Sequence, residues 1–381
     1  MTGRITNYGS QFVDSADIKS VAKALKQKNL TNGSLTPLFE EKLKLFLNVK
    51  YACSCNSGTS ALFLALKAIG TKENDIIIMP AVNFIASYNI SKLFNARIYL
   101  SDTDKKTGQM SPEDVENCCK KFKLKKIKAI IPMYNGGYPN NAENFLKFKK
   151  KYGSYIIEDA CHAFGSSYKF KKNFHMVGSC RHADISTFSF HPLKTITTGE
   201  GGLVTTNNKK LFEKIQKIRS HGILRTQNQH WQYDVVFEGL NFRLTDFQAA
   251  LGLSQLKKIK KFLNYRENIF NFYNKNLKNI KQIRCPKRIL YQKPSYHLYI
   301  INFKKINLKT KIKFIKFMKK NNVIVQQHYI PIYKFKSFKG KFINTNTEYY
   351  FKSSISLPIY YNLKKEKQLH IINLIKKFFT R

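Results

Sequence analysis

Hydrophobic residues in the first half of the chain form short apolar runs, separated by longer segments with helical periodicity. The runs 76–79 and 127–133 are almost entirely apolar, as expected for strands covered on both faces. Between such runs, apolar residues recur every three or four positions, which predicts amphipathic helices over 58–69 and 86–94. This alternation favours an α/β fold, with a mostly parallel central sheet flanked by helices.

Turn and capping residues set the expected limits of these elements. Ser111 and Pro112 predict a helix start, with a capping serine, a proline at the first helical position and acidic residues directly after. We expect strands over 51–55, 75–79, 96–100, 127–133 and 154–158, and helices over 37–47, 58–69, 86–94 and 145–151.

The pattern changes after about residue 240. Thr245 and Gln248 have capping-box spacing and predict the start of a long helix through Phe262. Further helices are expected over 269–277, 310–320 and 366–378, and strands over 296–303 and 323–325. A chain of 381 residues suits two domains. We therefore expect a large domain over residues 1–249 and a smaller C-terminal α+β domain over residues 250–381.

The charge balance is extreme, with 67 Lys+Arg against 23 Asp+Glu and a formal net charge of +44. Such a charge favours a polyanionic partner when considered alone. The lysines are scattered at helical spacing among apolar residues, however, and no zinc-finger, RNP-like or basic-zipper pattern is present. We therefore expect solvated lysine-rich helix faces and no nucleic-acid partner.

Other compositional features bear on location and metal binding. No apolar run is long enough for a membrane span, and the first 20 residues lack the apolar stretch of a signal peptide. The seven cysteines are irregularly spaced, which argues against a disulfide framework and fits no standard zinc site. We expect a cytoplasmic protein with no membrane partner and no metal.

Two residues have the properties that pyridine-cofactor chemistry requires. Asp159 closes an apolar strand, so it is expected at the carboxyl edge of the sheet, where ligands bind. Lys194 follows another apolar strand, and desolvation there would lower its pKa and favour the neutral amine that Schiff-base chemistry uses. A carboxylate can face the ring nitrogen of such a cofactor. These residues equally fit a helix-capping Asp and a surface Lys.

The segments 159–163 and 188–202 resemble the signature of the DegT/DnrJ/EryC1/StrS sugar aminotransferases. The resemblance extends over nearly the whole chain. It implies a fold-type-I transferase with pyridoxal 5′-phosphate as cofactor, acting on nucleotide-linked keto sugars. Further matching segments are 30–33, 39–41, 56–62, 219–222, 240–246, 295–299, 328–331 and 356–358.

The resemblance also implies roles for three catalytic residues. Lys194 matches the lysine that binds the cofactor as a Schiff base, and Asp159 matches the acid that keeps the ring nitrogen protonated. His162 lies where the family has a Gln or His beside the phenolic oxygen of the cofactor. Without the resemblance, a lone His after a strand is usually a structural residue.

Further residues match positions that bind the cofactor or the substrate. Asn241 matches an asparagine that reaches the phosphate from the neighbouring subunit, which implies a homodimer with shared active sites. Without the resemblance, the 57–59 turn is also a common helix cap, and Phe84 is an ordinary core residue. The implied cofactor-binding set is Ser57, Gly58, Thr59, Phe84 (ring stacking), Asp159, His162, Ser189, Lys194 and Asn241. Arg219, His221, His328 and Tyr329 match segments near the sugar-nucleotide site.

Within the family, the chain most resembles members that transfer an amino group, with L-glutamate as the expected donor, to C4 of a UDP-linked 4-keto-6-deoxy-N-acetylhexosamine of the pseudaminic acid type. The loop 133–141 departs from the family pattern near the ligands. A bacillosamine-, legionaminic- or perosamine-type substrate therefore remains an alternative. A second alternative is a non-catalytic basic binding or regulatory protein on the same fold.

Overall fold

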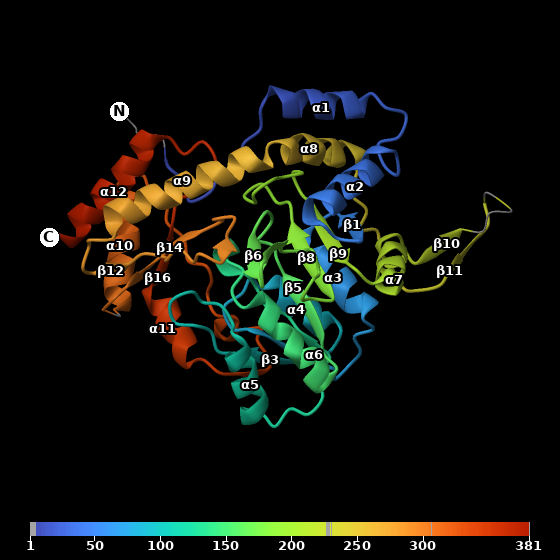
Figure 1. Cartoon of the computed structure of the whole chain (residues 1–381), viewed down its shortest axis with the longest axis horizontal. Helices are drawn as coiled ribbons and strands as arrows, with labels where there is room; N and C mark the ends of the chain where they lie inside the picture. Colours follow the sequence, from blue (N-terminus) through green and yellow to red (C-terminus); the bar gives the residue numbers. More distant parts are fainter. Residues whose placement is uncertain (1–4, 226–228, 230, 306, 381) are drawn as a thin grey trace.

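The computed structural model describes residues 5–225, 229, 231–305 and 307–380, and an eight-stranded sheet forms its centre (Figure 1). The sheet order is β1-β9-β8-β5-β4-β2-β3-β15, and all pairs from β8 to β15 are parallel. β9 pairs antiparallel with both β8 and β1. The strands are β1 (Tyr51–Cys55), β2 (Ile76–Pro80), β3 (Arg97–Ser101), β4 (Ala129–Ile130), β5 (Tyr155–Asp159), β8 (Ile185–Ser189), β9 (Gly202–Thr206) and β15 (Lys341–Phe342).

Helices cover both faces of this sheet, because successive residues of the buried strands point to opposite sides. Ile77 packs in a core cluster with α3, α4 and α7, whereas Ile78 packs in another cluster with α5 and α6. The α/β fold with a mostly parallel sheet is thus confirmed. The flanking helices are α2 (Leu35–Leu47), α3 (Gly58–Ala68), α4 (Ala86–Leu93), α5 (Pro112–Lys121), α6 (Lys147–Tyr152) and α7 (Lys209–Arg219).

The C-terminal segment forms a second core around a three-stranded sheet in the order β12-β14-β16. β15 also comes from this segment but pairs with β3 of the large sheet. The division into domains 1–249 and 250–381 stays a prediction. The elements are α8 (Asp246–Lys257), α9 (Ile259–Leu277), β12 (Ile283–Arg284), β14 (Tyr299–Phe303), α10 (Leu308–Lys320), α11 (Thr345–Ser353), β16 (Ser354–Leu357) and α12 (Lys365–Phe379).

Several expected elements differ from the structure. The capping box of Thr245 and Gln248 is present, but the long helix is interrupted at Lys258 between α8 and α9. The expected strand 127–133 is reduced to the two residues of β4. The expected strand 323–325 is wrong: Val323 makes only an isolated bridge to Thr6, since β14 pairs with β12 and β16 instead.

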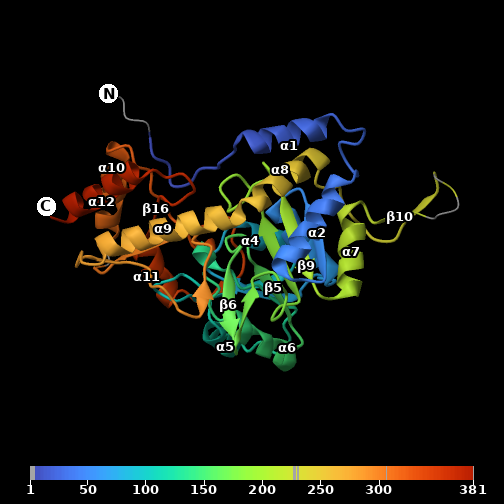
Figure 2. The ribbon, with the colours of Figure 1, turned by 45° about the horizontal axis from the view of Figure 1, so that its top comes forward.

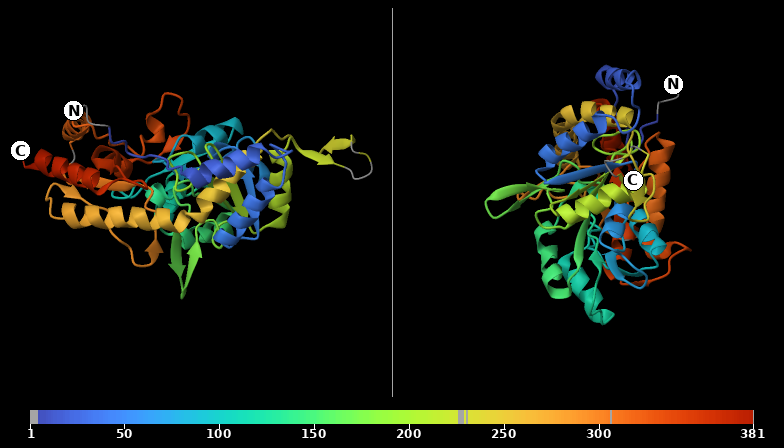
Figure 3. Two further views of the ribbon diagram at one scale, coloured as in Figure 1. Left: turned by 90° about the horizontal axis from the view of Figure 1, so that it is seen from above. Right: turned by 90° about the vertical axis from the view of Figure 1, so that its right-hand side faces the viewer.

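Two hairpins project from the body of the molecule (Figure 3). β6 (Ser167–Phe170) and β7 (Asn173–Met176) form one hairpin, whose sheet is completed by β13 (Gln292–Lys293). β10 (Ile223–Arg225) and β11 (Tyr233–Val235) form the other, which we call the arm. Tyr233 and Val235 of the arm are more than half exposed, at 55% and 56%.

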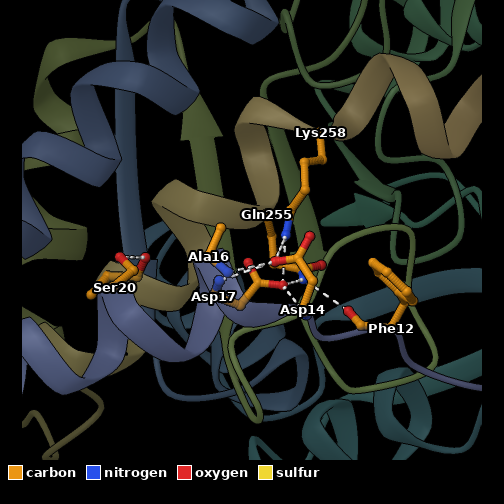
Figure 4. Close-up of polar contacts among 8 residues, drawn as sticks. Phe12, Asp14, Ala16, Asp17, Ser20, Gln255 and Lys258 are labelled. Carbon is orange, nitrogen blue, oxygen red and sulfur yellow. Dashed lines mark hydrogen bonds and ion pairs between the residues drawn. The ribbon is translucent and has the colours of Figure 1, made fainter.

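Helix α1 (Ser15–Leu25) lies along α8 and fixes the N-terminal segment (Figure 2). Asp14 and Asp17 both form ion pairs with Lys258, at 2.8 and 2.6 Å, and Gln255 donates to the carbonyl oxygen of Phe12 at 2.9 Å (Figure 4). Thr6 is held separately by a hydrogen bond to Asn322. Within the described residues, no helix is both long enough and apolar enough to cross a membrane.

Candidate active site

A pocket of about 420 Å³ lies at the carboxyl edge of the sheet. Asp159 is the last residue of β5, and Ser189 is the last residue of β8. β1 runs in the same direction as β8, because two antiparallel pairings through β9 restore the direction. The turn between β1 and α3 therefore meets Asp159 and Ser189 at one edge, where open α/β sheets bind ligands.

Most of the residues singled out in the sequence line this pocket, and three do not. Asn241, Arg219 and His221 lie outside the pocket of the described chain. The residues that line it are Ser57, Gly58, Thr59, Phe84, Asp159, His162, Ser189, Lys194, His328 and Tyr329.

Asp159 is buried, with 4% of its surface exposed, and three donors orient its carboxylate. The Ser87 hydroxyl donates to Oδ2 at 3.0 Å, the Asn83 amide to Oδ2 at 3.5 Å, and the Cys161 backbone N–H to Oδ1 at 3.3 Å. Since donors reach both oxygens, the side chain has a fixed direction at the pocket floor. A fixed carboxylate can hold a proton on a nearby ring nitrogen.

Lys194 lies in the turn after β8, and its backbone N–H donates to the carbonyl oxygen of His191 at 2.9 Å. Burial lowers the pKa of Lys194 below its ordinary value, and the negative charge of Asp159 only partly opposes this effect. The local environment therefore raises the fraction of neutral amine, which is the form that attacks a carbonyl carbon.

The turn before α3 forms a narrow cradle. Ser57 caps the helix by accepting from the Ser60 N–H at 3.0 Å. A Cβ atom on Gly58 would lie 2.8 Å from Cβ of Ser189, and one on Gly202 would lie 2.2 Å from the carbonyl oxygen of Ser57. Only glycines fit at these two positions without displacing the turn. A helix N-terminus facing a pocket suits a phosphate group.

Three of the histidines that line the pocket, His162, His297 and His328, lie close together. His162 is 2% exposed, its Nε2 is 2.8 Å from the Tyr329 hydroxyl, and its ring is 4.2 Å from that of His297. Burial, with a further contribution from Lys194, lowers the pKa of His162 well below its ordinary value and that of His328 to about 3. Among the residues that the structure describes, no group of His, Cys, Asp or Glu is arranged to hold a metal ion.

The three residues outside the pocket have other neighbours. Arg219 forms an ion pair with Glu40 at 2.6 Å and donates to the Ser54 carbonyl oxygen at 3.0 Å, which ties α7 to α2 and β1. His221 and Asn241 are exposed near the base of the arm. In this chain, Arg219 therefore has a structural partner, and the substrate roles of Arg219 and His221 stay predictions.

Several pocket residues were not identified from the sequence. Tyr8 and His297 line the pocket, and Asn83 and Ser87 hold Asp159 from more than 70 positions away in the chain. For Asn83, the only sequence signal was its place beside Phe84. His297 lies in the segment 295–299 that matches the family, although no role was predicted for it, and nothing in the local pattern distinguishes Tyr8.

The fold and the pocket together define a pyridoxal phosphate-dependent transferase. The chain belongs to the DegT/DnrJ/EryC1/StrS aminotransferase family, whose family model matches residues 11–376. The protein is therefore a sugar aminotransferase that uses pyridoxal 5′-phosphate, and the non-catalytic alternative no longer holds. The glycine cradle, the oriented carboxylate and the desolvated lysine fit the phosphate, ring nitrogen and aldehyde of this cofactor.

Individual relatives include enzymes for different nucleotide sugars. The chain is 37% identical to the UDP-4-amino-4,6-dideoxy-N-acetyl-beta-L-altrosamine transaminase of Campylobacter jejuni, covering 97% of this chain and 98% of the relative. It is 32% identical to the GDP-perosamine synthase of Escherichia coli O157:H7, covering 100% and 97%. The solved structure of Helicobacter pylori PseC, an aminotransferase involved in the biosynthesis of pseudoaminic acid, superposes with a TM-score of 0.90 at 32% identity, covering 99% and 100%.

Proposed function

We propose that this sugar aminotransferase moves the amino group of L-glutamate to C4 of a UDP-linked 4-keto-6-deoxy-N-acetylhexosamine of the pseudaminic acid type. The observation that carries the proposal is Lys194 facing the same pocket as Asp159, in a chain similar over its length to a transaminase named for such a UDP sugar. The products are 2-oxoglutarate and the 4-amino sugar nucleotide.

Six residues are proposed to surround the cofactor. The backbone amides of Gly58 and Thr59, with the hydroxyls of Ser57 and Ser189, bind the phosphate at the N-terminus of α3. Phe84 stacks on the pyridine ring, in keeping with its place on the pocket wall and its exposed fraction of 54%. His162 lies beside the phenolic oxygen.

Asp159 and Lys194 are proposed to carry the proton chemistry. When bound, pyridoxal phosphate supplies an electron sink for negative charge at the amino acid's Cα. Asp159 keeps a proton on the ring nitrogen, and the three donors to its carboxylate maintain its alignment. The Lys194 amine removes the proton from Cα of the donor and delivers it to C4′ of the cofactor, and it works in the reverse direction with the keto sugar.

We also propose a homodimer, with Asn241 of the partner subunit reaching the cofactor phosphate. The exposed position of Asn241 outside its own pocket, beside the arm with its exposed Tyr233 and Val235, supports this arrangement. Mixing Lys194→Ala with Asn241→Ala subunits should restore activity, because each mixed dimer then contains one complete site. Failure of the mixture, with both variants folded and exchanging subunits, would contradict shared sites.

The nucleotide sugar is proposed to bind above the cofactor, between His328 and Tyr329 on one side and the loop 133–141 on the other. His328 and Tyr329 line the pocket, as does Met133 of this loop. Arg219 and His221 would meet the substrate only in a neighbouring subunit's site. A cytoplasmic location stays a prediction, in keeping with an enzyme that uses nucleotide-linked sugars.

The alternative substrate is a GDP-linked sugar of the perosamine type, and the observation behind it is the similarity to GDP-perosamine synthase. A panel of UDP- and GDP-linked 4-keto-6-deoxy sugars, incubated with the enzyme and glutamate, distinguishes the two by product mass and NMR. We expect amination of the UDP-linked N-acetylhexosamine at C4. Preference for the GDP-linked sugar, or for bacillosamine- or legionaminic-type precursors, would overturn the proposed substrate while leaving the enzyme class unchanged.

A further inference from the structure

Two hydrogen bonds fix the position of the proton on His162. The backbone N–H of Gly136 points at Nδ1 of His162 at 3.3 Å, and Nε2 of the same ring lies 2.8 Å from the Tyr329 hydroxyl. A backbone N–H can only donate, so Nδ1 must accept this bond and carries no proton. Gly136 has a φ of 73°, a left-handed conformation that a glycine adopts without strain.

His162 is neutral as well as fixed. Its ring is 2% exposed and packs against the ring of His297, so a second proton would place a charge in a buried environment. Burial and Lys194 together lower its pKa well below the ordinary value. The single ring proton therefore sits on Nε2 and is donated to the Tyr329 oxygen.

This assignment determines the direction of the Tyr329 hydroxyl. Since its oxygen accepts from His162, its own hydrogen must point away from that ring. Burial, with a contribution from Asp159, raises the pKa of Tyr329 well above its ordinary value, so the phenol keeps this hydrogen. Tyr329 lines the same pocket as Lys194 and Asp159, and accepting one hydrogen bond strengthens a hydroxyl as a donor.

We propose that the Tyr329 hydroxyl donates a hydrogen bond to a ligand oxygen in the pocket, and that His162 is the positioning residue that directs it. This inference rests on the proposed function, which offers two oxygens that could accept the hydrogen bond. They are the C4 carbonyl oxygen of the keto sugar and the phenolic oxygen of the cofactor. Either gains negative charge during the reaction, and a directed donor stabilises such charge. The step is a hydrogen bond and needs no proton transfer.

The first test uses the protein without cofactor. The ¹⁵N shifts of its 9 histidines, with His162 assigned through the His162→Gln variant, report which ring nitrogen carries the proton. We expect His162 to be protonated at Nε2 only, unchanged between about pH 5 and 8. Protonation at Nδ1, or titration in this range, would overturn the proposal whatever the substrate is.

The second test separates the two oxygens with Tyr329→Phe in the cofactor-loaded enzyme. If the acceptor is the sugar carbonyl, amination of the keto sugar slows about 10²-fold, while the half-reaction with glutamate keeps its rate. If the acceptor is the phenolic oxygen, the absorbance spectrum of the cofactor changes at a different pH than in the wild type, even without substrate. Normal behaviour in both measurements would overturn the proposal.

Two further variants distinguish positioning from simple structural support. His162→Gln retains an N–H donor and an acceptor, so it should keep most of the activity. His162→Leu has neither group in its side chain and should lose that activity. Tyr265→Phe removes a partly buried hydroxyl that donates to the Leu363 carbonyl oxygen at 3.0 Å, outside the pocket, and should change neither half-reaction. Equal losses in the Gln and Leu variants would contradict the positioning role.

Discussion

Lys311 of α10 offers a quantitative test of how burial controls a charge in this fold. It is 3% exposed and donates to Gln327 Oε1 and to the Phe351 carbonyl oxygen, with its Nζ 5.0 Å from the centre of the Phe351 ring. Within the described residues, it forms no ion pair with a carboxylate. Burial lowers the pKa of Lys311 from its ordinary 10.5 to about 7. The substitution Lys311→Met removes this buried amine.

The pKa difference corresponds to about 5 kcal/mol of unfavourable free energy when Lys311 is charged in the folded protein. Between about pH 7 and 10.5, the unfolded chain binds a proton that the folded chain does not, so wild-type stability rises by about 1.4 kcal/mol per pH unit. The full penalty applies below pH 7 and is lost above 10.5. Methionine at this position does not titrate, so the penalty is absent at every pH. It also lacks the hydrogen bonds of the lysine, whose loss costs about 1–3 kcal/mol of stability.

Lys311→Met should therefore be about 2–4 kcal/mol more stable than the wild type at pH 6, and less stable by about 1–3 kcal/mol near pH 10.5. Urea denaturation of the cofactor-free protein at several pH values measures this difference. Lys313→Met, at an exposed position on the same helix, is the matched control, because it also replaces one lysine of α10 by methionine. If the difference in unfolding free energy between Lys311→Met and the wild type stays constant with pH, the reasoning is refuted.

Three further predictions concern the pocket. Asp159→Asn should lower the turnover number by several orders of magnitude with cofactor still bound, as steady-state rates and absorbance will report. Ser87→Ala removes the 3.0 Å donor to Asp159 and should cost about tenfold in turnover, whereas Ser91→Ala on the same helix should not. Gly202→Ala, whose Cβ would lie 2.2 Å from Ser57 O, should weaken cofactor binding at least about tenfold in fluorescence titrations, while Gly9→Ala should not.

Local signals in the sequence were sufficient for the sheet and for the residues at its edge. Asp159 ends a run of apolar residues, and such runs mark strands buried on both faces, so its position at the carboxyl edge followed from the pattern alone. The capping boxes at Ser111 and Thr245 likewise depend on residues three positions apart. These features are local, and local features are visible in one sequence.

The remaining features depend on contacts between distant segments. Val323–Val325 has the β-branched residues of a strand, but a strand forms only along an extended pairing partner, and here Val323 makes only an isolated bridge to Thr6. Ser87 could not be linked to Asp159 because the contact depends on how α4 packs at the end of β5. The Glu40–Arg219 ion pair is a similar case, with its residues on α2 and α7.

The N-terminal segment is anchored on both sides of Tyr8, by Thr6 at Asn322 and by Asp14 at Lys258. Tyr8 thus forms part of the pocket wall without belonging to either core. A protease cut between these two anchors would release that wall, yet leave Lys194 and the sheet edge intact. We expect nicked enzyme to keep its fold and to bind small ligands more weakly.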